Sequence, residues 1–225
     1  LSKESQLVTK KDVVCIALSN LAAPCGKVQI KCYDAGVVPP LLDLLVISED
    51  VGDVVNEYAA AVVQAIAVVS QNKLRLYNNG VVPLLLNLLR GDGHPMTKEQ
   101  AMAGLMWLAT GNSTQKLVYK CNVLPVILDV LTDKDGTITQ ATTEFACGAL
   151  EGFARDTDNR VSLLNDRFMS VMVKVLQPSL DGITLNTKMS LVRDCVNVSL
   201  LVYSVCVIAW KPCSHFLYIF YRRHY

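Results

Sequence analysis

The sequence predicts an all-α protein built from stacked helical units, and three observations support this prediction. Related segments recur along the chain: "YDAGVVPPLLDLL" (33–45), "YNNGVVPLLLNLL" (77–89), "YKCNVLPVILDVL" (119–131) and a weaker "LLNDRFMSVMVKVL" (163–176). Their matched residues Gly36, Gly80, Asn122 and Arg167 lie 44, 42 and 45 residues apart, and such periods are typical of helical repeats. Hydrophobic residues make up 52% of the chain but aromatic residues only 7%. This mixture, rich in Leu, Val and Ala, suits closely stacked helices.

Each recurring segment begins with a predicted tight turn between two helices. Gly36 and Gly80 are expected to adopt a left-handed backbone, which costs glycine little because it has no Cβ. Asn122 tolerates that conformation better than most residues. Arg167 tolerates it poorly, so the fourth turn is predicted to differ from the other three.

The helix that follows each turn has its own pattern. Pro39, Pro83 and Pro125 come three residues after the turn residue, in the first helical turn, where a missing N–H costs little. Ser170 takes this place in the fourth copy. The L-L-x-L-L tail then supplies an apolar face at helical spacing.

A longer amphipathic helix is predicted to precede each of these pairs. Its end reads "IALSNLA" (16–22), "AAVVQAIA" (60–67), "AGLMWLA" (103–109) and "GALEGFA" (148–154). Two of the long helices are predicted to open with Thr-x-x-Gln capping boxes, at 97–100 and 137–140. Small residues recur where these helices would have to pack closely: Ala17, Ala61, Gly104 and Ala149.

Two shorter helices and one longer helix per period, in this order, resemble the armadillo repeat, whose pattern is "ALxNLA … N+xxIxxxG-hhP-hhxLL". The resemblance covers about residues 10–200. It implies a right-handed superhelical solenoid of about four three-helix repeats, the first and last incomplete. One unit cannot bury its apolar face alone, so the copies share a core. The expected units are residues 1–23 (partial), 24–70, 71–111, 112–155 and 156–200, followed by an atypical apolar and basic tail at 201–225.

The resemblance also implies a function. In armadillo proteins the third helices line a concave groove that binds extended segments of other proteins. The family's groove asparagine is matched by Asn20, and Gln64 is placed at the equivalent position in the next repeat. Trp107 and Gly152 take the third and fourth positions and depart from the pattern. A slip of one residue would put Met106 in place of Trp107.

A second row of candidate contact residues lies two turns earlier, at Asp12, Asn56, Glu99 and Glu144. On stacked parallel helices this row would be mostly acidic and would select a basic or polar partner segment. The alternative is that acidic residues favour the first turns of helices because of the helix dipole. Trp107 is similarly ambiguous, because an exposed tryptophan would be a binding hot spot whereas a buried one would belong to the core.

Two narrower functions remain as alternatives to a general scaffold. Nuclear-import receptors of this family carry a tryptophan one turn before the groove asparagine. The matching residues here are Ile16, Ala60, Ala103 and Gly148, so the ladder of an importin-like nuclear-transport adaptor is absent. A membrane-tethered adaptor would use residues 196–220, but Lys211 and Pro212 interrupt that apolar run below the length of a spanning helix.

Composition restricts the partners and the compartment. The chain has 21 Lys and Arg against 20 Asp and Glu, which gives no electrostatic reason to expect nucleic acid or an anionic membrane. Its eight cysteines form no C-x-x-C pair. A reduced, cytoplasmic protein is therefore predicted, with the nucleus as the alternative location.

One motif suggests catalysis. "DKDGT" (133–137) fits the nucleophile motif of haloacid-dehalogenase-type phosphatases, in which Asp133 would attack phosphorus and Asp135 would act as acid and base. That motif must follow a buried strand, whereas the repeat register places it in a loop after a helix. The histidines and cysteines lack zinc spacing. We therefore expect no enzymatic activity, no cofactor and no metal.

The two ends of the array raise a further expectation. Residues 10–23 read as a third helix that lacks a first and a second helix, and residues 186–205 read as the third helix of a further, degenerate repeat. An uncapped end of a solenoid exposes its core. The chain is therefore expected to belong to a longer array or to lean on another protein at its N-terminal edge.

Overall fold

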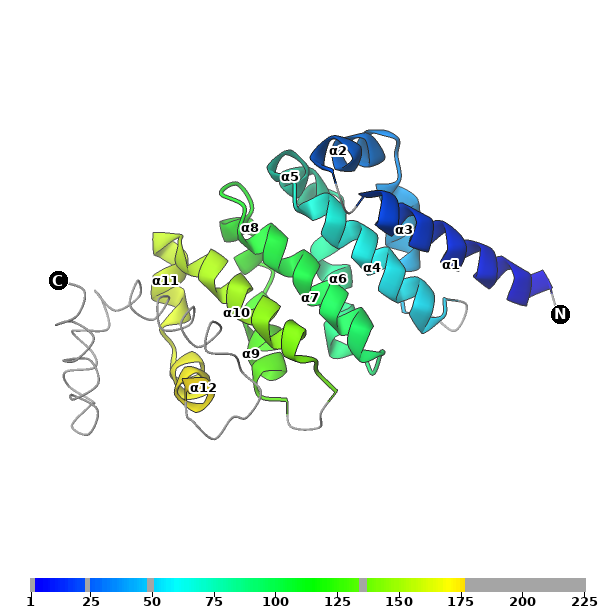
Figure 1. The fold of residues 1–225 in the computed structure, drawn as a ribbon. Coiled ribbons are helices and arrows are strands. Elements are labelled where there is room, and N and C mark those ends of the chain that lie inside the picture. The colour runs from blue at the N-terminus through cyan, green and yellow to red at the C-terminus, as the bar shows by residue number, and fades with distance from the viewer. Residues whose placement is uncertain (1–2, 23–24, 48–50, 134–136, 177–225) are drawn as a thin grey trace, which may run out of the picture.

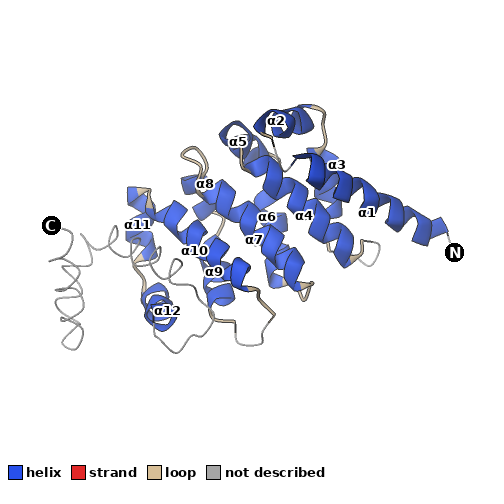
Figure 2. Ribbon diagram, viewed as in Figure 1, coloured by secondary structure: helices blue, strands red, loops and turns tan. Residues whose placement is uncertain are grey.

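The computed structural model describes residues 3–22, 25–47, 51–133 and 137–176. This part of the chain folds into twelve α-helices joined by turns and short loops, without a β-sheet (Figure 2). The prediction of an all-α fold is confirmed.

The helices fall into three classes that alternate along the chain. The long third helices are α1 (Lys3–Ala22), α4 (Asp53–Ala67), α7 (Pro95–Ala109) and α10 (Gln140–Ala154). The first helices are α2 (Gly26–Asp34), α5 (Ser70–Asn78), α8 (Gln115–Tyr119) and α11 (Thr157–Leu163). The second helices are α3 (Val38–Leu44), α6 (Val81–Arg90), α9 (Val123–Leu131) and α12 (Asp166–Leu176).

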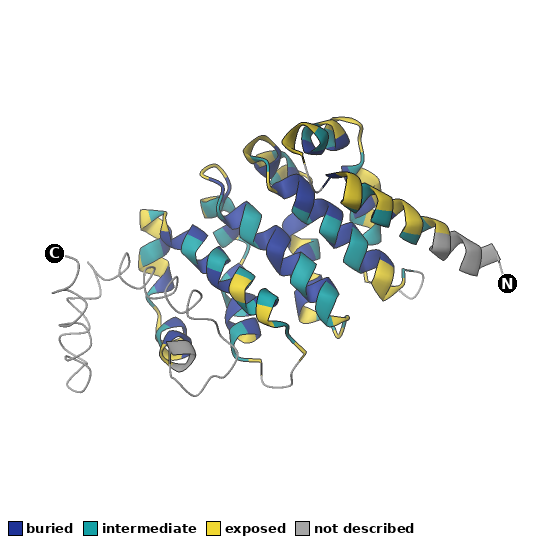
Figure 3. Cartoon of the chain, in the orientation of Figure 1, coloured by how far each residue is buried: buried dark blue, intermediate teal, exposed yellow. Residues whose placement is uncertain are grey.

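The long helices form the spine of the molecule. Helix α4 packs between α1 and α7, and α7 packs between α4 and α10, so that the four lie side by side (Figure 1). Helices α4, α7 and α10 also pack on the second helices of their own repeats, which are α3, α6 and α9. The resulting core is continuous from repeat to repeat, and its side chains are mainly Leu, Val, Ala and Ile (Figure 3).

The predicted turns are confirmed. Gly36 and Gly80 have φ values of 77° and 78°, and Asn122 has a φ of 57°. No other described residue apart from glycine has a positive φ. The fourth turn differs, as expected for Arg167, because the side-chain oxygen of Asn165 accepts the backbone N–H of Phe168 at 2.9 Å and so caps α12.

The predicted capping boxes are wrong. Helix α7 begins at Pro95 and its N-cap is His94, whereas Thr97 lies buried inside the first turn. Helix α10 begins at Gln140, three residues after Thr137, and its N-cap Thr139 accepts the N–H of Thr142 at 3.1 Å. In both helices the capping residue lies a few positions from the predicted threonine.

A buried asparagine ties neighbouring repeats together. Asn72 in α5 is fully buried, and its amide donates to the carbonyl oxygens of Ile66 (3.2 Å) and Gln29 (3.3 Å). One bond holds the end of α4, and the other reaches the first helix of the preceding repeat. Asn72 stands at the asparagine of the "N+xxIxxxG" part of the armadillo pattern, and it connects two repeats.

Several predictions fall outside the described residues. They are the further third helix at 186–205, the possible membrane segment at 196–220 and the tail at 201–225. Within the described helices, none combines the length and the apolar character needed to cross a membrane.

Candidate functional site

The long helices supply a structural register for the candidate site. Helices α4, α7 and α10 each contain fifteen residues, ending at Ala67, Ala109 and Ala154. Helix α1 ends at Ala22. Counting back from these four alanines therefore identifies equivalent positions on neighbouring helices.

In this register one row of side chains is entirely acidic. Its members, which we call the acidic row, are Asp12, Glu57, Glu99 and Glu144. All four are partly or fully exposed to solvent. The sequence prediction of Asn56 in this row is wrong, because Asn56 is 3% exposed and donates to the carbonyl oxygen of Leu44 at 2.6 Å.

The carboxylates of the acidic row are close enough to influence one another. Burial raises the pKa of Glu57, the neighbouring His94 lowers it, and the negative charge of Glu99 raises it again. Glu57 Oε2 lies 3.8 Å from His94 Nδ1. Glu99 Oε2 in turn accepts the hydroxyl of Thr139 at 2.6 Å, at the start of the next long helix. The row thus runs continuously across α4, α7 and the beginning of α10.

Asp12 extends the row onto α1. Its Oδ1 atom is buried, and no described residue donates a hydrogen bond to it. Burial, followed by the charge of Asp12, raises the pKa of the adjacent Cys15 thiol. A buried carboxylate oxygen without a donor is costly.

The helix dipole does not account for the row. Glu57, Glu99 and Glu144 are each the fifth residue of their helices, and α7 and α10 have no acidic residue in the first turn. The favourable interaction of a carboxylate with a helix N-terminus falls off within that first turn. The three glutamates therefore sit beyond the region where the dipole would select them.

Partly exposed aromatic and amide side chains lie beside the acidic row. The next residue on each helix is Tyr58, Gln100 or Phe145, and each is partly exposed. Aromatic faces next to carboxylates suit the aliphatic stems and cationic heads of Lys and Arg. We call this surface the long-helix face. It consists of the acidic row, these neighbours and the partly exposed residues one to two turns further along the same helices, among them Gln64 and Met106.

The structure changes the register of the predicted groove residues. Gln64 aligns with Ser19, Met106 and Glu151, not with Trp107. It is partly exposed and remains on the long-helix face. The slip of one residue that the sequence left open is therefore present.

The true equivalents of Asn20 and Trp107 are Ala65 on α4 and Gly152 on α10. Asn20 is exposed, but Ala65 and Gly152 are buried. The tryptophan-ladder position likewise shifts from Ala60 to Ala61, which leaves the absence of tryptophan from that row unchanged.

Trp107 is neither fully exposed nor fully buried. Its ring is partly exposed and packs against the core. The Nζ atom of Lys73 lies 5.5 Å from the ring centroid and donates to Thr110 Oγ1 at 3.2 Å. Burial, and then the charge of Arg155, lowers the pKa of this lysine. Trp107 thus contacts the core and Lys73 while the residue stays partly exposed to solvent.

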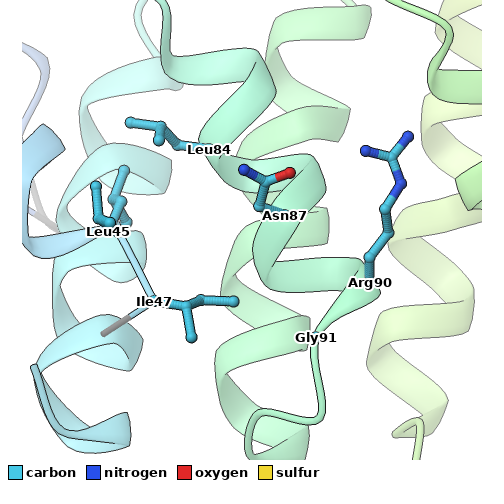
Figure 4. Close-up of a pocket in the computed structure, with 7 residues that line it drawn as sticks. Leu45, Ile47, Leu84, Asn87, Arg90 and Gly91 are labelled. Atoms are coloured by element: carbon cyan, nitrogen blue, oxygen red, sulfur yellow. The ribbon is translucent and has the colours of Figure 1, made fainter. Parts of the chain in front are cut away.

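A shallow cavity lies away from the long-helix face and was not predicted. It has a volume of about 390 Å³ between the end of α3 and helix α6. Figure 4 shows Leu45 and Ile47 on one side and Leu84, Asn87 and Arg90 on the other. It is mostly apolar with a polar rim and contains none of the predicted contact residues. Sequence periodicity does not describe the residues after α3, Val46 and Ile47, which form part of its wall.

The phosphatase hypothesis does not fit the fold. Asp133 is exposed and follows helix α9, whereas the motif requires a buried strand before it. Among the described residues, no group of three or more His, Cys, Asp or Glu side chains is arranged to hold a metal ion.

Comparison with solved structures identifies the architecture. A designed armadillo repeat protein in complex with the peptide (KR)4 superposes with a TM-score of 0.71 and 18% identity, covering 83% of this chain and 74% of that chain. An engineered protein matches with a TM-score of 0.73 and 20% identity, covering 88% and 80%. The chain has the armadillo-repeat fold.

Another set of solved structures has the same architecture. Computationally designed armadillo repeat proteins for modular peptide recognition superpose with a TM-score of 0.70 and 19% identity, covering 83% of this chain and 74% of that chain. No protein-family model matches the sequence, and no curated protein matches it significantly. At identities this low, the armadillo likeness establishes the fold alone.

Proposed function

We propose that this protein is a non-enzymatic scaffold that binds an extended, basic segment of a partner protein across the long-helix face. The observation that carries the proposal is the acidic row, which places one carboxylate on each of four successive long helices. An extended chain crossing those helices would meet a carboxylate at every repeat. A segment with regularly spaced Lys or Arg residues would therefore be favoured.

The energetic state of Glu57 supports a binding role. Burial raises the pKa of its carboxyl group, and the nearby negative charge of Glu99 raises it further. Groups whose pKa is perturbed by burial together with a specific charged neighbour are candidates for functional sites. A cationic partner would relieve the repulsion between Glu57 and Glu99.

Two of the solved structures with this fold support the proposal. One designed protein with the same fold binds the peptide (KR)4, and another set was designed for modular peptide recognition. Asn20, Gln64 and Trp107 complete the proposed contact set beside the acidic row. The two amides would hydrogen-bond the peptide backbone, and the open part of the Trp107 ring would pack against a side chain.

Fluorescence anisotropy with labelled peptides tests the proposal. A peptide of alternating Lys and Arg should bind, and one of alternating Glu and Asp should not. The double variant Glu57→Gln, Glu99→Gln should weaken binding about two- to thirtyfold, because each partly exposed charge pair contributes roughly 0.2–1 kcal/mol. The affinity of the wild type should fall as salt increases.

A matched control variant separates the effect of the acidic row on binding from the effect of net charge. Asp43 is exposed on α3, away from the long-helix face. The variant Asp43→Asn should bind the basic peptide within about twofold of wild type. If Asp43→Asn weakens binding as much as the double variant does, attraction is nonspecific and the proposed site is wrong.

A further inference from the structure

The cavity between α3 and α6 is a feature that the binding of basic peptides does not use. It has a volume of about 390 Å³. Val46 and Ile47, which follow the end of α3, line it and are 46% and 55% exposed. Figure 4 shows Ile47 reaching from the end of α3 towards α6, which contributes Leu84. Aliphatic side chains from both elements therefore form an apolar wall that solvent reaches.

The next two repeats do not place apolar side chains at the positions of Val46 and Ile47. Counting ten and eleven residues from the left-handed turn residue of each repeat gives three corresponding pairs: Val46 and Ile47, Arg90 and Gly91, and Thr132 and Asp133. The later pairs are polar or lack a side chain. Stacking of the repeats therefore does not require the apolar pair after α3.

The opposite wall of the cavity is open because residue 91 is a glycine. A Cβ atom built on Gly91 would lie 2.9 Å from Cδ1 of Ile47. Gly91 has φ −71° and ψ 169°, an extended conformation that residues other than glycine adopt readily. The backbone therefore does not demand glycine here, and any side chain would take up part of the space beside Ile47.

The rim of the cavity favours a negative charge. Arg90 is the one charged side chain among the described residues that line it, and it is exposed. None of the ion pairs between described residues involves Arg90. Asn87 is also exposed and lies three residues earlier on α6, so the two side chains share one side of the helix. A guanidinium and an amide placed in this way can both donate hydrogen bonds to one carboxylate.

We propose that the cavity is a second docking site, for a partner segment that carries a branched aliphatic side chain next to a carboxylate. The aliphatic side chain would lie between Ile47 and Leu84, and the carboxylate would accept hydrogen bonds from Arg90 and Asn87. A shallow cavity cannot enclose most of a small molecule, as ligand pockets do, whereas a protein segment needs to insert only one or two side chains. The charge preference is opposite to that of the long-helix face, so the inference does not depend on the binding of basic peptides.

Methyl NMR of the full chain with labelled Ile and Leu side chains tests the proposal. The blocked peptide Gly-Leu-Ile-Glu-Gly should shift the methyl signals of Ile47 and Leu84. Lys in place of Glu in the peptide should weaken binding about threefold or more, since a partly exposed ion pair is worth a factor of about this size and Arg90 would repel the ammonium group. Equal affinities of the two peptides, or no shift at Ile47 and Leu84, would overturn the proposal.

Variants of the lining residues locate the contact. Arg90→Gln removes the charge that distinguishes the two peptides and should bind them equally. Gly91→Val places a side chain beside Ile47 and should weaken binding of the Glu peptide about fivefold or more. Ile47→Ser should weaken it likewise, and because Ile47 is exposed this change should leave the fold intact.

Gly93→Val is the matched control for Gly91→Val. A Cβ atom on Gly93 would meet nothing within 4 Å, and Gly93 does not line the cavity. Its affinity for the Glu peptide should stay within about twofold of wild type. If Gly91→Val and Ile47→Ser bind the peptide as well as Gly93→Val does, the cavity is not the site.

Two further measurements identify the occupant. Glu49 and Asp50 follow Ile47 closely in the sequence. If the double variant Glu49→Gln, Asp50→Asn raises the affinity for the Glu peptide about threefold or more, carboxylates of the chain itself compete for the cavity. Methyl shifts at Ile47 that change on dilution without peptide would make a second copy the occupant. Either result would overturn the assignment to a partner segment, and unchanged affinity and shifts would support it.

Discussion

The contact between α7 and α10 at Gly152 allows a sharp test of how closely the long helices pack. A Cβ atom at this position would lie 2.7 Å from the carbonyl oxygen of Ala109, 2.8 Å from its carbonyl carbon and 3.0 Å from the nitrogen of Thr110. All three are backbone atoms, so no side chain can rotate away. The variant Gly152→Ala must push the two helices apart.

The expected change in the free energy of unfolding of this variant is the sum of two opposed effects. Overpacking a tight interior contact costs about 1–3 kcal/mol, and the upper end applies here because only backbone obstructs the new methyl group. Replacing Gly by Ala inside a helix recovers about 1 kcal/mol. The net loss in the free energy of unfolding is therefore about 2 kcal/mol, which corresponds to a fall in Tm of about 4–8 °C.

Gly148 on the same helix is the matched control. A Cβ there would meet Met106, with Sδ at 2.8 Å and Cγ at 3.1 Å, and a flexible methionine side chain can move aside. Urea denaturation should show Gly148→Ala within about 1 kcal/mol of wild type and Gly152→Ala clearly below it. Equal stability of the two variants would refute the close approach of α7 and α10.

Three further predictions concern residues whose roles the structure defines. Glu57→Gln should raise thermal stability at pH 7. The pKa of the Glu57 carboxyl is raised in the folded protein, so the wild type loses stability as pH rises through that pKa. The difference in stability between the variant and the wild type should therefore vanish below about pH 4. Asn72→Ala should cost about 2 kcal/mol in urea denaturation by removing two buried hydrogen bonds to backbone carbonyls, and no loss would mean that water replaces them. Gly80→Ala and Asn122→Ala should each cost about 1 kcal/mol through left-handed strain, whereas Gly93→Ala, which has open space and no positive φ, should be neutral by calorimetry.

Much of the fold could be predicted because the same local sequence features recur in each repeat. The glycine or asparagine turn, the proline in the following helix and the L-L-x-L-L face all recur at one period. Gly36, Gly80 and Asn122 show the predicted left-handed backbone. Agreement among several copies compensates for the weakness of each single signal.

The site was less predictable because a helix rotates its side chains by about 100° per residue. Matching short motifs placed Asn56 in the acidic row, whereas the true member is the adjacent Glu57. That shift of one residue changes a solvent-facing carboxylate into a buried amide. The equal lengths of α4, α7 and α10 fix the register, and they are known only from the fold.

The predicted starts of helices α7 and α10 were wrong for a related reason. Thr97 and Thr137 each begin a Thr-x-x-Gln sequence, yet His94 and Thr139 are the N-caps. Pro95 favours the first helical position, which moves the start of α7 ahead of Thr97. In α7 the local capping signal therefore loses to the proline two residues before Thr97.

The most direct test of the central claim is photo-crosslinking of a bound basic peptide. A peptide of alternating Lys and Arg with a central benzophenone is irradiated in complex with the full chain, and mass spectrometry then locates the attachment. The account predicts crosslinks on the long-helix face, at Met106 on α7 and around Tyr58 and Phe145. Crosslinks confined to the cavity between α3 and α6, at Ile47 or Leu84, would contradict it.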